Sequence, residues 1–512
     1  MFTSAAASRP AARPRAPGPF GTSRNSTERC STACPCSASA PAARSGLSTT
    51  MRSVPPRSTV RATTLTRSSP RIRHARPRAP GLFGSRRESS VRIAMRGSLA
   101  AKLRYHQQMV VDAPFTVPVA KRSAAFDYAI RGIVAEARKA EARGRRVRYL
   151  NIGDPVLFGF RTPPHLIEAV ERAMRDGYNG YTPAAGVPEA REAVAADFET
   201  RGLAVSPDRV VLTAGASEGI DLALSVLVDH GDEVLVSVPT YPLYTGVLAK
   251  LGARAVYYRK DPAYGWQPDI EHVESLISPR TRALVVVDPN NPTGAVYTRD
   301  NRLALLELAD RHNIVLLSDE GYTDLAYDGR VSPLGSYNPD APVISFSSLS
   351  KAHLAPGWRA GWMAVGGGAR LDAALAAIKD MADGRLCSVG PMQYAVPAAL
   401  NGDKSHQVEF LRALRERAEV TTRRLNAIDG VSCVRPAAAF YAMPKVELPP
   451  GRTDEDYVIG LLRATGLLCV YGSGFGTAPA DGYFRIVFLA PPAELDSFYD
   501  AIETFTADFL AE

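Results

Sequence analysis

Four short runs of Val, Ile and Leu constrain the fold of this chain more than any other feature of its sequence. They read EVLVSV, RALVVVD, NIVLLSD and VISFSS, and they occupy residues 233–238, 282–288, 313–319 and 343–348. Continuous apolar runs of this length are typical of strands that are buried on both faces. Amphipathic segments of helix length, or turns, separate them. The pattern predicts an α/β fold, with a mostly parallel sheet that is flanked by helices.

These runs predict a large domain at residues 165–395. After it comes a helical stretch near 405–428, and then VSCVRPAAAFYAMPKV and YFRIVFL, which have the composition of strands. We expect a smaller α+β domain formed by residues 115–160 together with 400–512. Its N-terminal part contains FDYAIRGIVAEARKAEARG, where apolar residues recur at helical spacing up to Gly144, a residue type that often follows a helix.

Residues 1–110 are rich in Ala, Arg, Ser and Pro and show no helical or strand period. A segment of this composition buries too little apolar surface to fold, so we expect a disordered tail. Three interpretations stay open: an organelle transit peptide, a basic disordered arm, or translation that starts later, at Met95 or Met109. We expect a cytoplasmic protein, or an organellar one if the tail is a transit peptide.

The charge and the cysteines argue against several classes of protein. The formal net charge is +9, yet residues 1–100 hold eighteen arginines and two acidic residues, so the rest of the chain is mildly acidic. We therefore expect no nucleic-acid partner. No run of about 18 apolar residues predicts a membrane span. Outside the tail, Cys387, Cys433 and Cys469 lack the spacing of a zinc site or a disulfide ladder, so we expect no metal.

Small, polar and aromatic residues follow the predicted strands at the points where these strands end. Functional residues of parallel sheets gather at the carboxyl ends of the strands, so we expect these residues to lie along one edge. They are Ala214-Gly215-Ala216-Ser217 after RVVLT, Pro239-Thr240-Tyr241 after EVLVSV, DPNNPTG (288–294) after RALVVV, Asp319-Glu320-Gly321-Tyr322 after NIVLLS, and Leu349-Ser350-Lys351 after VISFSS.

Two of these segments have both a structural and a functional interpretation. Gly215, Ala216 and Ser217 open a helix, where backbone N–H groups and a serine hydroxyl can bind an anion, although Ser is also a common N-cap. The segment NNPTG has the composition of a turn. Asn291 within it can equally donate its amide to a phenolate oxygen.

Asp319 and Lys351 give the sharper hypothesis. A carboxylate at the end of an apolar strand is usually a cap, but a buried one needs a positive partner, such as a protonated pyridine nitrogen. Tyr322 can reach the same ring. Lys351 normally extends to solvent, but at a strand end it can form an imine with an aldehyde, while Ser348 and Arg359 flank a phosphate. Together these residues predict a phosphorylated pyridine aldehyde, pyridoxal phosphate.

The segment SLSKAHLAPGWRAG, residues 348–361, closely resembles the lysine signature of class I/II aminotransferases, which are pyridoxal-phosphate enzymes of fold type I. NIGDP, YTPAAGVPEAREA, GASEG, PTYP, NPTG and DEGY occur in that family's order, and the resemblance covers about 120–510. YAIRGIVAEA, WQPDI and YGSGFG look most like the bacterial and archaeal alanine aminotransferases. In one departure, Gly321 stands where the family usually has a bulky aliphatic residue.

The resemblance implies a role for each matching residue around the cofactor. Lys351 would bind the aldehyde and later move protons, and Asp319 would hold the pyridinium. Further cofactor contacts would come from Asn291 and Tyr322 at the phenolate oxygen, Tyr241 on the ring face, and Gly215, Ala216, Ser217, Ser348 and Arg359 at the phosphate. Tyr181 would reach the phosphate of a neighbouring subunit, which implies a homodimer with shared sites.

For the substrate, the resemblance implies that Arg485, with the backbone of Gly153, binds the α-carboxylate. Arg485 lies in the apolar run YFRIVFL, where it would otherwise be an edge-strand arginine. Arg131 is the candidate for the side-chain carboxylate of glutamate, and it would otherwise belong to a solvated helix face.

We therefore expect a ping-pong transamination between an L-amino acid and a 2-oxo acid, with L-alanine and 2-oxoglutarate giving pyruvate and L-glutamate. The alternatives are an aminotransferase for aromatic, branched-chain or aspartate donors, or a β-lyase. A transcription regulator with a DNA-binding head is a further alternative, but residues 1–110 lack the apolar periodicity of a helix-turn-helix.

Overall fold

The computed structural model of the chain describes residues 117–120, 122 and 133–511. All of these residues belong to one unit, Ala113–Glu512. The predictions made for the tail, 1–110, and for Arg131 lie outside the described residues.

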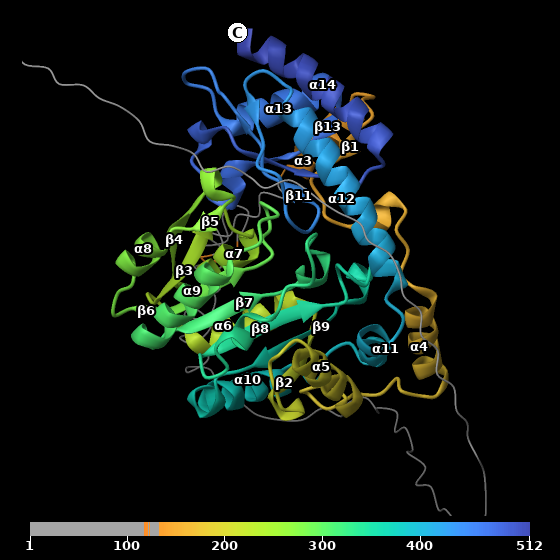
Figure 1. Ribbon diagram of the computed structural model, residues 1–512. Helices are drawn as coiled ribbons and strands as arrows, with labels where there is room; N and C mark the ends of the chain where they lie inside the picture. The colour runs from red at the N-terminus through yellow and green to blue at the C-terminus, as the bar shows by residue number, and fades with distance from the viewer. Residues whose placement is uncertain (1–116, 121, 123–132, 512) are drawn as a thin grey trace, which may run out of the picture. The chain divides into compact units, whose positions relative to one another are not determined.

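An eight-stranded sheet lies at the centre of the described structure (Figure 1). In spatial order its strands are β2 (Val210–Ala214), β9 (Ala360–Val365), β8 (Val343–Ser348), β7 (Val315–Asp319), β6 (Thr281–Val287), β3 (Glu233–Val238), β4 (Arg254–Asp261) and β5 (Gln267–Pro268). The five strands from β8 to β4 run parallel, whereas β9 is antiparallel to both of its neighbours and β5 to β4. The predicted α/β fold with a mostly parallel sheet is confirmed.

The four apolar runs form β3, β6, β7 and β8, and their observed bounds differ from the predicted ones by no more than two residues. Three further strands of this sheet were not predicted: β4, β9 and the two-residue β5. β4, RAVYYRKD, lies near the edge of the sheet and mixes exposed charged positions with buried ones, so its sequence is not continuously apolar. β9, AGWMAV, begins directly after Arg359, inside the segment that was assigned to the lysine signature.

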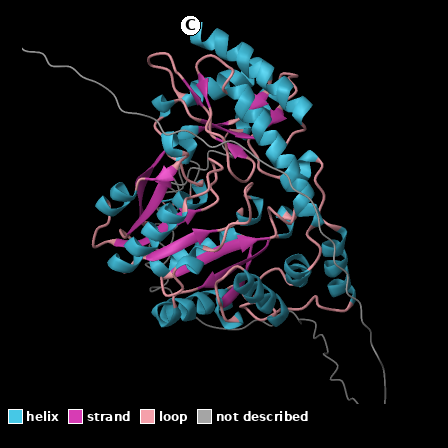
Figure 2. Ribbon diagram, in the orientation of Figure 1, coloured by secondary structure: helices cyan, strands magenta, loops and turns pink. Residues whose placement is uncertain are grey.

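Helices cover both faces of this sheet (Figure 2). One face carries α6 (Ala216–Leu227), α7 (Pro242–Leu251) and α10 (Asp372–Gly384), and the other carries α5 (Pro188–Thr200), α8 (Ile270–Ser275), α9 (Arg299–His312) and α11 (Ala395–Asn401), with α4 (Pro164–Arg175) packed on α11. Within β6, Ala283 and Val285 pack toward the first set, and Leu284 and Val286 toward the second. Because side chains alternate along a strand, such strands need apolar residues at every position.

The remaining described residues form short sheets packed against helices. β1 (Arg148–Tyr149) pairs with β13 (Leu467–Leu468), β15 (Phe484–Val487) lies between β11 (Tyr441–Ala442) and β14 (Val470–Tyr471), and β10 (Val431–Ser432) pairs with β12 (Lys445–Val446). One hydrophobic core joins them to α3 (Val134–Ala142), α12 (Ser405–Leu425), α13 (Asp454–Thr465) and α14 (Pro492–Ala511). The predicted domain boundaries stay a prediction. None of the described helices combines the length and apolar character that a membrane crossing requires.

Candidate active site

The residues that follow the parallel strands lie at one edge of the large sheet. β7 ends at Asp319 and β8 at Ser348, with Lys351 in the turn that follows. After β2, α6 begins at Ala216, and after β3, Tyr241 is the N-cap of α7. The topology explains this grouping, because the carboxyl ends of parallel strands meet at the same edge.

Asp319 is a buried carboxylate. Its Oδ1 accepts a hydrogen bond from the backbone N–H of Gly321 at 3.3 Å, and its Oδ2 accepts one from the hydroxyl of Tyr244 on α7 at 3.4 Å. Burial raises the pKa of Asp319 to about 6, and the positive charge of Lys351 acts in the opposite direction. Within the described part of the chain, no basic side chain forms an ion pair with Asp319. The site therefore favours a cationic ligand at this carboxylate.

Lys351 points toward the segment NIGDP, where its Nζ donates a hydrogen bond to the carbonyl oxygen of Gly153 at 2.9 Å. Nζ also lies 6.0 Å from the ring centroid of Tyr322 and 5.8 Å from that of Phe440. Gly153 has no room for a side chain, because a Cβ there would lie 2.2 Å from the hydroxyl oxygen of Tyr441. The amine of Lys351, the backbone of Gly153 and the hydroxyl of Tyr441 thus lie close together.

Arg359 packs against the start of α6. Gly215, the N-cap, has a φ of 75°, and a Cβ on it would lie 2.2 Å from Nη2 of Arg359. Nη2 donates to the carbonyl of Ala214 at 3.2 Å, and Nη1 donates to that of Pro356 at 3.1 Å and to the hydroxyl of Ser350 at 3.5 Å. A guanidinium is therefore held beside the N-terminal N–H groups of a helix, and both features favour an anion.

Tyr322 and Tyr441 form a pair of buried hydroxyls whose oxygens lie 3.0 Å apart. Burial and the neighbouring Tyr441 raise the pKa of Tyr322 well above its usual value, so its hydroxyl keeps its proton at neutral pH. Sequence reasoning missed Tyr441. It lies on β11, and only the pairing of β11 with β15 brings it to the site. Tyr244 was missed for a similar reason, because the packing of α7 on the sheet places its hydroxyl.

Arg485 on β15 is almost completely buried, with 1% of its surface exposed. Its Nη1 donates to Oδ1 of Asn291 at 3.1 Å, and its Nη2 donates to the carbonyl of Asn151 at 2.5 Å. The guanidinium carbon lies 4.8 Å from the ring centroid of Tyr441 and 4.7 Å from that of Phe475. These contacts fix the plane of the guanidinium, the group that binds carboxylates through two parallel N–H bonds.

The other predicted site residues are placed as follows. The Ser348 hydroxyl accepts a hydrogen bond from the backbone N–H of Ser350 at 3.2 Å, and Ser217 lies in the first turn of α6. Tyr181 is 85% exposed, away from the core of its own chain. Arg131 lies outside the described residues. The roles assigned to these residues stay predictions.

The fold and this group of residues define a class of protein. A family model for class I and II aminotransferases matches residues 146–502, and the chain belongs to this family. The protein is a pyridoxal-phosphate-dependent transaminase.

Individual relatives are similar over most of their length. The alanine aminotransferase of Mycobacterium tuberculosis is 38% identical over 391 residues, which are 75% of this chain and 91% of the relative. The glutamate–pyruvate aminotransferase of Escherichia coli is 35% identical over 374 residues, 71% of this chain and 91% of the relative. The structure of the alanine aminotransferase from Pyrococcus furiosus superposes with a TM-score of 0.74, at 39% identity, and covers 76% of this chain and 100% of its own.

The residues present fit pyridoxal phosphate in three respects. The buried carboxylate of Asp319 suits a protonated pyridine nitrogen. The backbone around Gly215 is closely packed, since a Cβ on Gly361 would lie 2.5 Å from the carbonyl carbon of Gly215. Backbone N–H groups and the guanidinium of Arg359 are therefore the groups that can face a phosphate there. Lys351 supplies an amine at the same sheet edge for the aldehyde.

Proposed function

We propose that the protein transfers the amino group between L-alanine and 2-oxoglutarate, giving pyruvate and L-glutamate. The observation that carries the proposal is the buried Arg485, which is fixed by Asn291 and Asn151 in the site that contains Lys351. All four molecules carry a carboxylate next to the reacting carbon, and a guanidinium of fixed orientation recognises this group. The names of the relatives from M. tuberculosis, E. coli and P. furiosus support alanine as the donor.

When bound, pyridoxal phosphate supplies an aldehyde that takes up the amino group and a ring that withdraws electrons from the substrate Cα. We assign Asp319 to the ring nitrogen and Asn291 and Tyr322 to the phenolate oxygen. Lys351 is the general base and acid of the reaction. Its Nζ removes the proton from the substrate Cα, and the protonated amine then donates that proton to complete the transfer of the amino group. The carbonyl of Gly153, 2.9 Å from Nζ, holds the amine on the substrate side of the site.

The phosphate group is assigned to the start of α6. The backbone N–H groups of Gly215, Ala216 and Ser217 and the guanidinium of Arg359 supply hydrogen bonds and positive charge there, with Ser348 beside them. Because Arg359 is permanently charged, this end of the cofactor stays anchored while Lys351 exchanges its partner. Tyr241, at the N-terminus of α7, covers the ring face in this assignment.

We propose that a small donor side chain fits the site best. The hydroxyl of Tyr441 and the ring of Phe440 crowd the space beside Gly153, so that a single Cβ added there already meets both residues. A methyl group, as in alanine, needs less room than an aromatic or branched side chain. For the longer 2-oxoglutarate, Arg131 is the proposed partner of the second carboxylate.

We further propose a cytoplasmic homodimer in which Tyr181 of one subunit reaches the phosphate site of the other. The 85% exposure of its aromatic ring supports this, since the described part of its own chain leaves most of the ring uncovered. Tyr178, Leu157 and Val156 are also exposed, as expected of residues that an interface covers.

A donor panel tests the substrate assignment. With 2-oxoglutarate as acceptor, we expect kcat/KM for L-alanine to exceed that for L-aspartate, L-tyrosine and L-leucine by at least roughly 10-fold, since a misfit side chain in a tight pocket costs about 1–3 kcal/mol. Lys351→Ala is the control, which should still bind the cofactor through the phosphate site and Asp319 but lose turnover. Faster turnover with another donor would overturn the alanine assignment. Catalytic release of pyruvate and ammonia from an amino acid with a leaving group on Cβ, such as L-cysteine, without an oxo-acid acceptor would indicate a β-lyase.

A further inference from the structure

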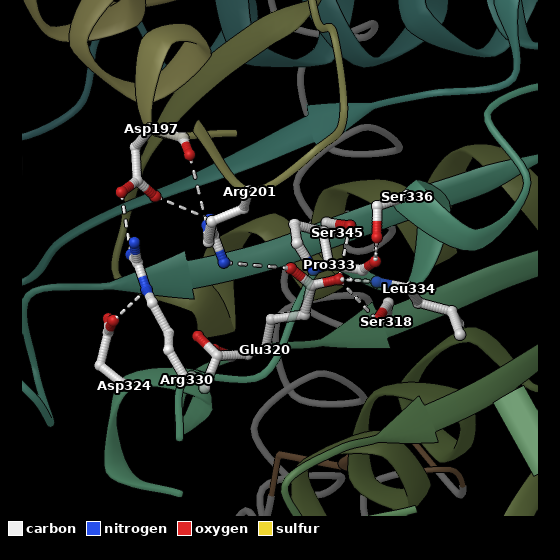
Figure 3. Close-up of polar contacts among 12 residues, drawn as sticks. Asp197, Arg201, Ser318, Glu320, Asp324, Arg330, Pro333, Leu334, Ser336 and Ser345 are labelled. Carbon is white, nitrogen blue, oxygen red and sulfur yellow. Dashed lines mark hydrogen bonds and ion pairs between the residues drawn. The ribbon is translucent and has the colours of Figure 1, made fainter. Parts of the chain in front are cut away.

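A partly buried network of charged residues includes Glu320, the residue that follows Asp319 in the sequence (Figure 3). It consists of three carboxylates and two guanidiniums, from Asp197, Arg201, Glu320, Asp324 and Arg330. Asp197, on α5, forms ion pairs of 2.8 Å with both Arg201 and Arg330, and Arg330 also pairs with Asp324. The proposed function uses none of these residues.

Glu320 connects this network to the sheet. Its Oε1 accepts hydrogen bonds from the hydroxyls of Ser318 and Ser345, both at 2.9 Å, and from the backbone N–H of Leu334 at 3.0 Å (Figure 3). Side chains alternate along a strand, so Ser318 and Glu320 point to one face of the sheet and Asp319 to the other. One carboxylate therefore ties together β7, β8 and the short helix η6 (Leu334–Tyr337).

The turn after Asp319 is held by backbone hydrogen bonds and by the side chain of Glu320. The backbone N–H of Glu320 donates to the carbonyl of Phe346 at 2.9 Å, and the carbonyl of Glu320 accepts from the hydroxyl of Thr323 at 3.2 Å. Gly321 has no side chain, and a Cβ there would meet only Oδ1 of Asp319, at 3.3 Å. Tyr322 follows directly, so the two residues assigned to the cofactor ring lie on either side of Glu320 and Gly321. The side chain of Glu320 therefore contributes to the position of both, together with the pairing of β7 and the contact of Tyr322 with Tyr441.

The network also contains more negative than positive charge when all five residues are ionised. Arg201 and Arg330 each have Asp197 at 2.8 Å, whereas Oε2 of Glu320 is 4.0 Å from Nη1 of Arg201. The surplus charge thus belongs to Glu320, the member next to Asp319. Burial raises the pKa of Glu320 and Arg201 opposes this, and the charge of Glu320 in turn raises the pKa of Asp319.

Arg201 is the cation that acts on Glu320, and the other charged groups around this strand end act on other residues. On the opposite face, Lys351 is the cation that acts on Asp319. His353 is buried, and its pKa is lowered to about 4, so it is neutral at pH 7. Lys404 acts on Asp197, at the far end of the network.

We propose that Glu320 is a positioning residue for the cofactor, which helps to fix the turn from Asp319 to Tyr322 and places a second buried negative charge next to Asp319. Two negative charges at one strand end hold a protonated ring nitrogen more strongly than one, because buried charges are weakly screened. The inference rests on the proposed role of Asp319 at that nitrogen. It assigns to Glu320 an electrostatic task that a purely structural residue would not have.

The test compares Glu320→Gln with Asp197→Asn, since each removes one carboxylate charge from the same network. Three measurements are made on each: the nitrogen-15 chemical shift of ring-labelled pyridoxal phosphate in the holoenzyme against pH, the Kd of the apoprotein for pyridoxamine phosphate, and the apoprotein Tm. We expect Glu320→Gln to lower the midpoint of ring-nitrogen deprotonation by roughly one pH unit and to weaken pyridoxamine phosphate binding roughly 10-fold. Its Tm should stay unchanged or rise, because the remaining charges balance.

Asp197→Asn should behave differently. Its Tm should be lower, since Arg201 and Arg330 each lose an ion pair of 2.8 Å, and its nitrogen midpoint should shift less than half as far. An unchanged nitrogen titration in Glu320→Gln, or equal shifts in the two variants, would overturn the inference about Glu320 and leave the proposed function intact. Asp319→Asn serves as the reference. If it too leaves the nitrogen titration unchanged, the proposed role of Asp319 fails, and the inference fails with it.

Discussion

At the residue scale, Arg485 shows how a charged side chain is kept inside an apolar unit. A buried charge is costly unless hydrogen-bond acceptors surround it, and here Asn291 and the carbonyl of Asn151 serve as acceptors. The ring of Tyr441 lies beside the guanidinium, and the hydroxyl of the same tyrosine contacts Tyr322. Tyr441 therefore joins the residues assigned to the substrate carboxylate to those assigned to the cofactor ring.

This dual contact leads to a prediction for Tyr441→Phe. The change removes the hydroxyl contact with Tyr322 but keeps the ring beside Arg485. A buried hydrogen bond contributes about 1 kcal/mol, so we expect kcat/KM for L-alanine to fall roughly 5-fold. Steady-state kinetics of Tyr441→Phe, Tyr322→Phe and the double variant should show strong non-additivity, because both single changes break the same contact.

Tyr457→Phe is the matched control for this cycle. Tyr457 is buried, and its hydroxyl contacts that of Thr506 at 2.7 Å, within the core of the short sheets. Because Tyr457→Phe also removes one buried hydroxyl contact, we expect it to lower the free energy of unfolding about as much as Tyr441→Phe does, without a change in kcat/KM. If the effects of the two site variants simply added, Tyr441 would not act through Tyr322.

At the element scale, the sequence predicts those parts of the site that depend on strand order alone. Inner parallel strands are apolar on both faces, so β3, β6, β7 and β8 were recognisable, and Asp319 and Lys351 followed from the strand ends. Tyr244 and Tyr441 were not predictable in this way. Their contacts depend on how α7 packs and how β11 pairs, and neither the helix nor the strand signals this in its own sequence.

The N-terminus of α6 gives a second prediction, for Gly215→Ala. The residue has a φ of 75°, and its Cβ would collide with the guanidinium of Arg359. We expect cofactor affinity to fall at least roughly 10-fold, as the anion cradle is displaced. Gly144→Ala is the control, because its φ is 82° but its Cβ would meet no atom within 4 Å.

Gly144→Ala should lower the free energy of unfolding by only about 1 kcal/mol, which is the cost of a left-handed backbone for a residue with a side chain. Urea unfolding of both apoproteins and titration with pyridoxal phosphate measure the difference. Equal cofactor affinity in the two variants would show that the Arg359 contact is irrelevant to binding.

The turn after β8 gives a third prediction, on pH. His353, two residues after Lys351, is buried, and its pKa is lowered to about 4 by desolvation, with His406, Lys404, Asp324 and Asp197 acting on it more weakly. The unfolded chain binds the proton more readily, so the stability from neutral His353 is fully present above about pH 6.5 and is lost as pH falls toward 4.

Across that window we expect wild type to lose on the order of 3 kcal/mol more than His353→Gln. Urea unfolding at a series of pH values measures the difference. His230→Gln, at an exposed position, should follow the wild-type curve. Parallel curves for wild type and His353→Gln would contradict the prediction.

At the scale of the whole molecule, the site draws on segments from Gly153 to Arg485, which span nearly the full length of the described chain. Residues of the large sheet and of the short sheets both contribute. A cofactor bound there interacts only with the folded chain and stabilises it by mass action. Folding, cofactor binding and, in the proposed dimer, subunit association are therefore coupled.

The proposed dimer leads to a fourth prediction, which a mixing experiment decides. Lys351→Ala and Tyr181→Ala each impair the homodimer, the first at its own site and the second at the partner's phosphate site. In a mixed dimer one site combines an intact Lys351 with an intact Tyr181 from the other subunit, while the second site carries both defects. Random association of equal amounts should therefore restore about a quarter of wild-type activity. If each chain built its site alone, mixing would give no more than the average of the two inactive preparations.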